Sequence, residues 1–222
     1  MGTVNTIIEF FQNGGPFMVP IAIVLFIGLA IALERFLFLS YAKTANKLAF
    51  NRILPMLKKR SYKDVVNFGQ NSRAPIARVI AAGVARMTQS PRRDDIELAM
   101  EEGVLEAMPR LERRTPYLAT LANIATLLGL LGTIIGLIAA FESVANADPA
   151  EKASQLSSSI SIAMNTTAFG LIAAIPLLFL HAILQNKTTD IIDGLEMASV
   201  KCLNMMSRGN EGVASSKTRA SD

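Results

Sequence analysis

Residues 115–141 read TPYLATLANIATLLGLLGTIIGLIAAF, and none of these 27 residues carries a charge. Two other stretches share this property, 10–33 with 24 residues and 153–186 with 34. An apolar helix needs about 20 residues to cross a bilayer, and a soluble helix of this length would show a charged stripe at 3.6-residue spacing. The sequence therefore predicts an all-α membrane protein, because 222 residues supply too little other chain to bury three such helices. Its three spans are predicted at 17–39, 116–141 and 160–185.

The composition excludes several other classes of protein. Charged residues make up 18% of the chain and hydrophobic residues 51%, which disfavours a disordered chain and a nucleic-acid binder despite a pI near 9.4. A single Cys and a single His exclude an intrachain disulfide, a cysteine zinc cluster and a multi-histidine metal site. No nucleophile–base pair and no nucleotide-binding loop stand out, so we expect no enzyme, no metal and no cofactor.

The basic residues predict how the chain is oriented in the membrane. Sixteen Lys and Arg residues fall between Arg35 and Arg114 and five more follow Asn186, whereas the segment between the second and third spans has only Lys152. The side with most Lys and Arg is cytoplasmic in most membrane proteins. Residues 1–16 contain no basic residue, so we do not expect the first span to be a cleavable signal peptide.

The resulting topology assigns each segment outside the spans to one side of the membrane. The predicted segments outside the spans are a periplasmic N-terminus at 1–16, a cytoplasmic helical loop at 40–115, a periplasmic loop at 142–159 and a cytoplasmic tail at 186–222. We expect the tail to be disordered from Arg208. Within the long loop we expect helices rather than a separate domain, and the last helix should run on into the second span with Pro109 and Pro116 as kinks.

The second and third spans carry stripes of small residues that favour close helix packing. Small side chains at three- or four-residue spacing let another helix approach closely. We expect this packing from Gly129, Gly132, Gly136, Ala163, Gly170 and Ala174. Pro176 removes one backbone hydrogen bond in the third span and predicts a kink.

Four threonines lie in the same two spans. Thr126 and Thr133 are seven residues apart on one face of the second span, and Thr166 and Thr167 lie near the middle of the third. Most intramembrane hydroxyls bond a backbone carbonyl one turn back; the alternative is that these four line a narrow, hydrated path for a small ion. No Asp, Glu, Lys or Arg lies in the middle of any span, so a proton carrier would need a carboxylate from a partner.

Two blocks in these spans resemble a known family. LGLLGTIIG at 128–136, followed by Phe141, and AMNTTAFGLIAAIP at 163–176 are similar to the two signature blocks of the MotA/TolQ/ExbB proton-channel family. LER at 33–35 is similar to that family's ending of the first span. The length and the three spans favour the ExbB/TolQ branch, and the resemblance covers most of the chain.

The resemblance implies a homopentamer in the bacterial inner membrane, with the second and third spans around a central pore. A single-span partner of the ExbD/TolR type would supply the protonatable Asp, which Thr133 and Thr167 would face. The implied function is to couple the proton-motive force to TonB-dependent outer-membrane transport, through a TonB-like protein. A TolQ-like role in the Tol-Pal envelope system and a passive membrane scaffold remain alternatives.

The sequence departs from the family pattern at two positions. Many relatives have a Pro where Thr126 stands, which changes the expected local shape of the helix. Some ExbB proteins have a Glu where Ile162 stands, so proton entry here cannot use that residue, and sodium coupling stays open.

Overall fold

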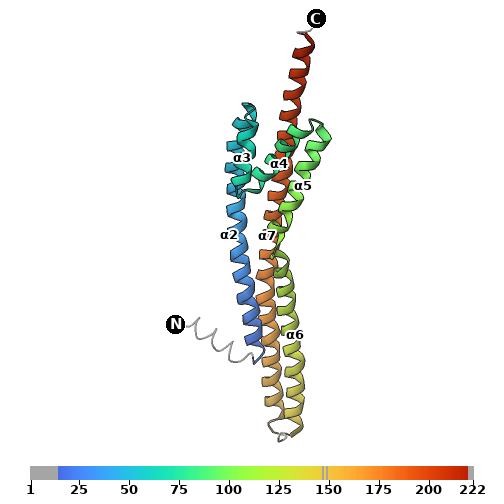
Figure 1. Cartoon of the computed structure of the whole chain (residues 1–222). Coiled ribbons are helices and arrows are strands. Elements are labelled where there is room, and N and C mark those ends of the chain that lie inside the picture. Colours follow the sequence, from blue (N-terminus) through green and yellow to red (C-terminus); the bar gives the residue numbers. More distant parts are fainter. Residues whose placement is uncertain (1–14, 147, 149, 220–222) are drawn as a thin grey trace. The chain divides into compact units, whose positions relative to one another are not determined.

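The computed structural model describes residues 15–146, 148 and 150–219, and these contain helices and no strand (Figure 1). The helices are α2 (Met18–Lys58), α3 (Tyr62–Asn71), α4 (Pro75–Gln89), α5 (Arg93–Glu112), α6 (Thr115–Asn146) and α7 (Lys152–Arg219). The chain divides into two compact units, the first from Met1–Arg35 with Arg114–Leu184 and the second from Phe36–Arg113 with Gln185–Asp222. Helices α2 and α7 each contribute one part to each unit. Residues 1–14, most of the predicted periplasmic N-terminus, lie outside the described residues.

The first unit is built from the apolar parts of three helices. Helix α6 has 32 residues, which at 1.5 Å per residue gives about 48 Å, more than the roughly 30 Å of a bilayer's hydrocarbon core. Among the described residues, three helical stretches are long and apolar enough to cross a membrane, Met18–Lys58, Arg93–Ala145 and Lys152–Met206. Each overlaps one predicted span.

The first unit buries small side chains and exposes large apolar ones. Its interior includes Ala122, Ala125, Ala140, Ala163 and Ala173, each at most 1% exposed. Its surface includes Phe26, Leu127, Phe141, Ile175 and Phe179, each more than 60% exposed. A water-soluble domain shows the opposite distribution, whereas lipid tails accept large apolar side chains and small residues let membrane helices pack closely. The surface of this unit is therefore one suited to lipid or to other membrane helices.

The second unit is organised around α4. This helix buries seven of its 15 residues, Ile76, Ala77, Val79, Ile80, Ala81, Gly83 and Val84. Gly69 of α3 approaches Ala81, and Gly103 of α5 approaches Val79. Leu39 and Ile53 of α2 and Leu195 and Leu203 of α7 add to the core. The helices expected in 40–115 are therefore not a domain of their own, because they share one core with the second part of α7.

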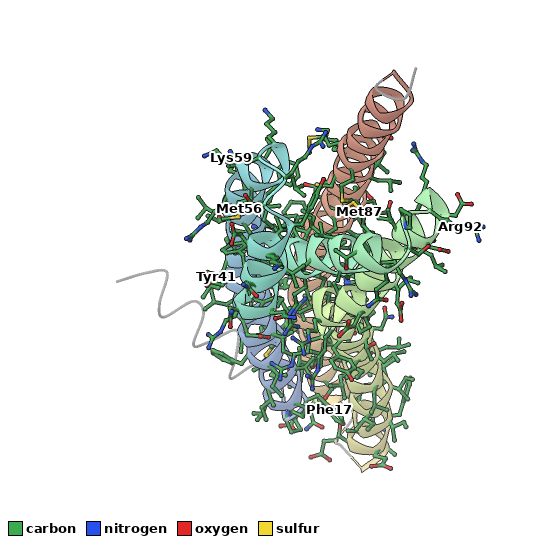
Figure 2. All side chains as sticks on the ribbon, turned by 45° about the horizontal axis from the view of Figure 1, so that its top comes forward. Phe17, Tyr41, Met56, Lys59, Met87 and Arg92 are labelled. Atoms are coloured by element: carbon green, nitrogen blue, oxygen red, sulfur yellow. The ribbon has the colours of Figure 1, made fainter. Side chains whose placement is uncertain are left out.

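The surface of the second unit is charged. Figure 2 shows Lys59 and Arg92 projecting from this unit, with Met56 near the end of α2 and Met87 near the end of α4. The described part of the unit thus combines an apolar core with a polar surface, as a water-exposed domain does.

One local feature differs from the sequence prediction. The expected continuous helix into the second span is interrupted at Arg113 and Arg114, where Arg114 has a φ of +68°. Pro116 accounts for this break, since its ring would clash with the carbonyl four residues earlier while it is well tolerated in the first turn of α6. Helix α7 is described to Arg219, and disorder of the chain end from Arg208 stays a prediction.

Candidate ion-path site

Helices α6 and α7 approach most closely where small residues face each other. A Cβ atom placed on Gly170 would lie 2.8 Å from the carbonyl oxygen of Ala125 and 3.0 Å from Cα of Gly129. A Cβ atom on Gly136 would lie 2.8 Å from Cβ of Ala163. Because backbone atoms cannot move aside as side chains do, the glycines at 129 and 170 are what permits this separation of the two helices.

The remaining residues predicted for helix packing fall into two groups. Gly132 lies against the methyl group of Thr166, and Ala174 is 2% exposed, so both are inside the unit. Pro176 lies within α7 and its side chain is exposed. A role for any of these residues in contacts between subunits stays a prediction.

Thr133 and Thr167 come together across the same helix pair. The Thr167 hydroxyl lies 2.8 Å from the carbonyl oxygen of Gly129 and 3.2 Å from the Thr133 hydroxyl oxygen. The Thr133 hydroxyl donates in turn to the carbonyl of Leu130, at 2.6 Å. Two side chains 34 positions apart in sequence thus form a short row of hydroxyl groups. Both are only partly buried.

The other two threonines of the predicted path are placed differently. Thr126 donates to the carbonyl of Ala122, 3.1 Å away in its own helix. Thr166 donates to the carbonyl of Ile162 at 3.0 Å and is 2% exposed. Each of these two hydroxyl groups thus donates its proton within its own helix. Their part in an ion path stays a prediction.

A second polar contact ties the start of α6 to α7. Nδ1 of His181 lies 3.0 Å from the carbonyl oxygen of Thr115. Because a carbonyl only accepts, Nδ1 carries the proton in this contact. Beside it Arg114 donates to Glu34 at 3.2 Å, and both side chains are about half exposed. This hydrogen bond makes His181 a contact between α7 and the start of α6. The contribution of Thr115 had no signal in the sequence beyond its place before Pro116.

The chemistry of this site is that of hydroxyl groups alone. Threonine hydroxyls donate and accept hydrogen bonds, but they do not ionise near neutral pH. Residues 115–141 and 153–186 hold no acid or base apart from His181, and no cluster of His, Cys, Asp or Glu suited to a metal occurs among the described residues. The pair can therefore assist the passage of an ion or a proton by hydrogen bonding, while neither threonine takes up the proton itself.

These features define an all-α multi-pass membrane protein in which two glycine-rich helices hold a pair of threonines. Comparison with known sequences narrows the class. The sequence model of the MotA/TolQ/ExbB proton channel family matches residues 71–197, more than half of the chain. The chain belongs to this family, and it is a channel subunit of the ExbB/TolQ branch.

Several relatives carry ExbB or TolQ names. A protein of Methanothermobacter thermautotrophicus, provisionally named a biopolymer transport protein ExbB homolog, is 29% identical over 87% of this chain and 68% of its own length. A provisionally named ExbB-like protein 3 of Synechocystis is 29% identical over 73% of this chain and 77% of its own. The Tol-Pal system protein TolQ of Haemophilus influenzae is 37% identical, but over 35% of this chain and 34% of its own.

Proposed function

We propose that the chain is the ExbB-type subunit of an inner-membrane motor, which couples the proton-motive force to TonB-dependent outer-membrane transport. The named ExbB relatives support this choice because they align with 73% and 87% of the chain, whereas the TolQ relative aligns with 35%. In this proposal the subunit forms a homopentamer, and an ExbD/TolR-like single-span protein occupies its pore and contacts a TonB-like protein.

The proposed topology has a periplasmic N-terminus and a cytoplasmic C-terminus. Its support is the placement of basic residues, since sixteen lie from Arg35 to Arg114 and five after Asn186. The second unit, which holds nearly all of them, would then lie in the cytoplasm. The turn between α6 and α7 would lie in the periplasm.

The contact between Thr133 and Thr167 carries the mechanistic part of the proposal. Its two hydroxyl oxygens lie 3.2 Å apart, in spans that contain no carboxylate. A protonated Asp of the single-span partner would need hydrogen-bond partners at membrane depth, because an unpaired polar group in hydrocarbon costs several kcal/mol. The threonine pair would supply them, so that the acid can release and take up its proton without entering bare lipid.

The test is proton flux in vesicles that hold this chain with its single-span partner. Thr133→Val and Thr167→Val remove the hydroxyls with little change in volume, and we expect each to reduce flux at least ten-fold while the complex still assembles. Thr120→Val is the matched control, since the Thr120 hydroxyl bonds the carbonyl of Pro116 in its own helix. Wild-type flux in both test variants would refute the threonine path and favour a passive scaffold.

A TolQ-like role is the second candidate, favoured by the match to the Haemophilus TolQ. Deletion of the chain in its own cell separates the two roles. Loss of TonB-dependent uptake with an intact envelope supports the ExbB role. Detergent sensitivity and leakage of periplasmic protein, with uptake retained, would assign the chain to the Tol-Pal system.

A further inference from the structure

A cavity of about 380 Å³ lies within the second unit, between α2, α4 and α5. Phe38, Tyr41, Ala42 and Ala45 of α2 form one wall, and Gly103 and Ala107 of α5 form another. Its size falls within the range of pockets that bind small ligands. The two aromatic side chains are exposed, Phe38 by 39% and Tyr41 by 67%, so the cavity opens beside an apolar, aromatic rim.

Three guanidinium groups line the same cavity. Arg73 stands just before α4, Arg78 lies in its first turns, and Arg110 belongs to α5. Arg73 and Arg78 are exposed, and neither forms a salt bridge with any residue that the structure describes. One carboxylate, that of Glu106, also lines the cavity. Three arginines against one glutamate leave the lining with a formal charge of +2.

The chemistry of these groups selects the ligand. Guanidinium groups bind phosphate oxygens in a bidentate manner, and basic pockets beside membrane helices bind anionic lipid headgroups. Phe38 and Tyr41 lie on either side of residue 39, where the first span is predicted to end, and Arg110 lies six residues before the second span. Tyr side chains at this level favour the membrane interface.

We propose that this cavity binds the phosphate of an anionic phospholipid, with Arg73 and Arg78 on the headgroup and the Phe38–Tyr41 rim against the start of its acyl chains. The inference needs the chain to lie in a membrane. It rests on the proposed topology only in placing the lipid in the cytoplasmic leaflet. A free phosphate or nucleotide offers the same anion without the apolar part, so the aromatic rim favours the lipid.

The test is retention of phospholipid by the purified full chain. Protein is exchanged into phosphatidylcholine nanodiscs with or without phosphatidylglycerol, released, and analysed by native mass spectrometry. We expect wild type to retain phosphatidylglycerol in preference to phosphatidylcholine, and the double variant Arg73→Gln/Arg78→Gln to lose about thirty-fold of this preference. That factor follows from about 1 kcal/mol for each basic residue near an anionic lipid surface.

Arg86→Gln is the matched control, because Arg86 is exposed on the same helix but does not line this cavity. It should retain the wild-type preference. No preference in wild type, equal loss in the control, or displacement of the lipid by inorganic phosphate alone at millimolar concentration would each overturn the proposal. Lipid retention is read without proton flux, so its failure is separate from failure of the proposed channel function.

Discussion

The Thr167 hydroxyl has one proton and two acceptors within reach, the Gly129 carbonyl at 2.8 Å and the Thr133 oxygen at 3.2 Å. It can donate to only one of them at a time. Interhelical hydrogen bonds of this kind contribute only about 0.6 kcal/mol on average in membrane proteins. This hydrogen bond therefore adds little to stability, and the hydroxyl is available for another role.

We predict that Thr167→Ser keeps proton flux within about three-fold of wild type, because serine retains the hydroxyl and loses only a methyl group. Thr167→Val keeps the shape of the side chain and loses the hydroxyl. It should lower proton flux strongly, while the free energy of unfolding falls by about 1 kcal/mol or less. Flux in proteoliposomes and a melting curve in detergent measure the two effects. A serine variant as inactive as the valine variant would show that the methyl group, rather than the hydroxyl, matters.

The single cysteine of the chain offers a test of the second unit's core. Cys202 is buried, and burial raises the pKa of its thiol from 9.0 to about 12. A raised pKa favours the neutral thiol in the folded state, so its contribution to stability is present below pH 9 and is lost as the pH rises toward 12. We predict that a maleimide leaves the native protein unlabelled at pH 7 and labels it after unfolding. Rapid labelling of the native protein would contradict this packing.

Within α7, two glycines stand in opposite surroundings. A Cβ atom on Gly170 meets backbone atoms of α6 at 2.8 and 3.0 Å, whereas one on Gly194 meets nothing within 4 Å. Glycine in a helix interior costs about 0.5–1 kcal/mol relative to alanine. The close approach of another helix offsets that cost at Gly170, and nothing comparable does so at Gly194.

We therefore predict opposite effects from the same substitution in one helix. Gly170→Ala should destabilise the protein by about 1–3 kcal/mol, because it forces α6 and α7 apart. Gly194→Ala should stabilise it by up to about 1 kcal/mol. Thermal unfolding of both variants in the same detergent provides the comparison. Equal effects of the two substitutions on stability would contradict the close contact of Gly170 with α6.

The placement of charge along the whole chain underlies the topology. We predict that a cysteine at Asn146, the last residue of α6, is labelled from outside the cell's inner membrane by an impermeant maleimide. A cysteine at Ser72, which follows α3, should be labelled only after the membrane is permeabilised. The native chain is the control for both, because its Cys202 is buried. Labelling of Ser72→Cys alone from outside would reverse the orientation.

Much of the candidate site follows from local sequence patterns. Long stretches without charge predict the spans because every unpaired charge in hydrocarbon is costly, whatever the tertiary contacts are. Glycines spaced at three or four residues predict a close helix contact, and Gly129 and Gly170 form one. Local patterns could not distinguish which of the four threonines contact each other, since the partner of a hydroxyl group depends on the facing helix. Thr133 lies against Thr167, while Thr126 and Thr166 bond their own helices.

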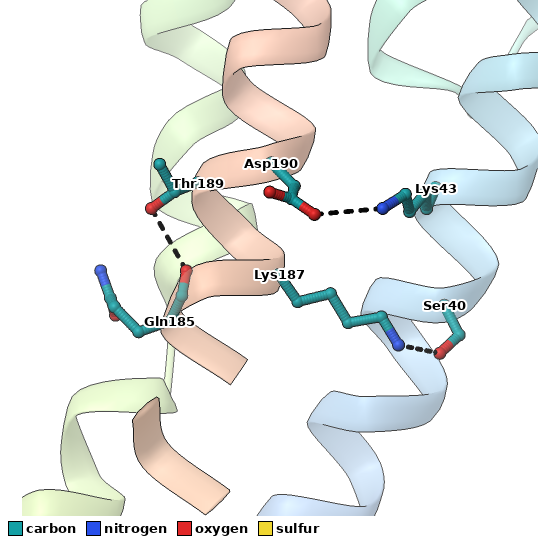
Figure 3. Close-up of polar contacts among 6 residues, drawn as sticks. All are labelled: Ser40, Lys43, Gln185, Lys187, Thr189 and Asp190. Carbon is teal, nitrogen blue, oxygen red and sulfur yellow. Dashed lines mark hydrogen bonds and ion pairs between the residues drawn. The ribbon is translucent and has the colours of Figure 1, made fainter. Parts of the chain in front are cut away.

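The second unit shows where local patterns end. The stripe of Ile191, Leu195, Ala198 and Cys202 on α7 is buried, and α2, α4 and α5 share its core. No pattern within residues 40–115 indicates that their partner lies more than 70 positions further along the chain. Polar contacts also join α2 and α7, as Figure 3 shows. Lys43 of α2 forms an ion pair with Asp190 of α7 at 3.2 Å, and Lys187 of α7 donates a hydrogen bond to Ser40 of α2 at 2.6 Å.

Composition and spacing were thus sufficient for the membrane class and the three apolar helices, since transfer into lipid depends on each residue's own side chain. The family followed from the resemblance of the blocks at 128–136 and 163–176. The pairing of Thr133 with Thr167, the break at Arg113–Arg114 and the cavity lined by Arg73 and Arg78 needed the folded chain. Each of these features depends on contacts between residues that are far apart in the sequence. Such contacts form only when the chain has folded, so a local sequence pattern does not predict them.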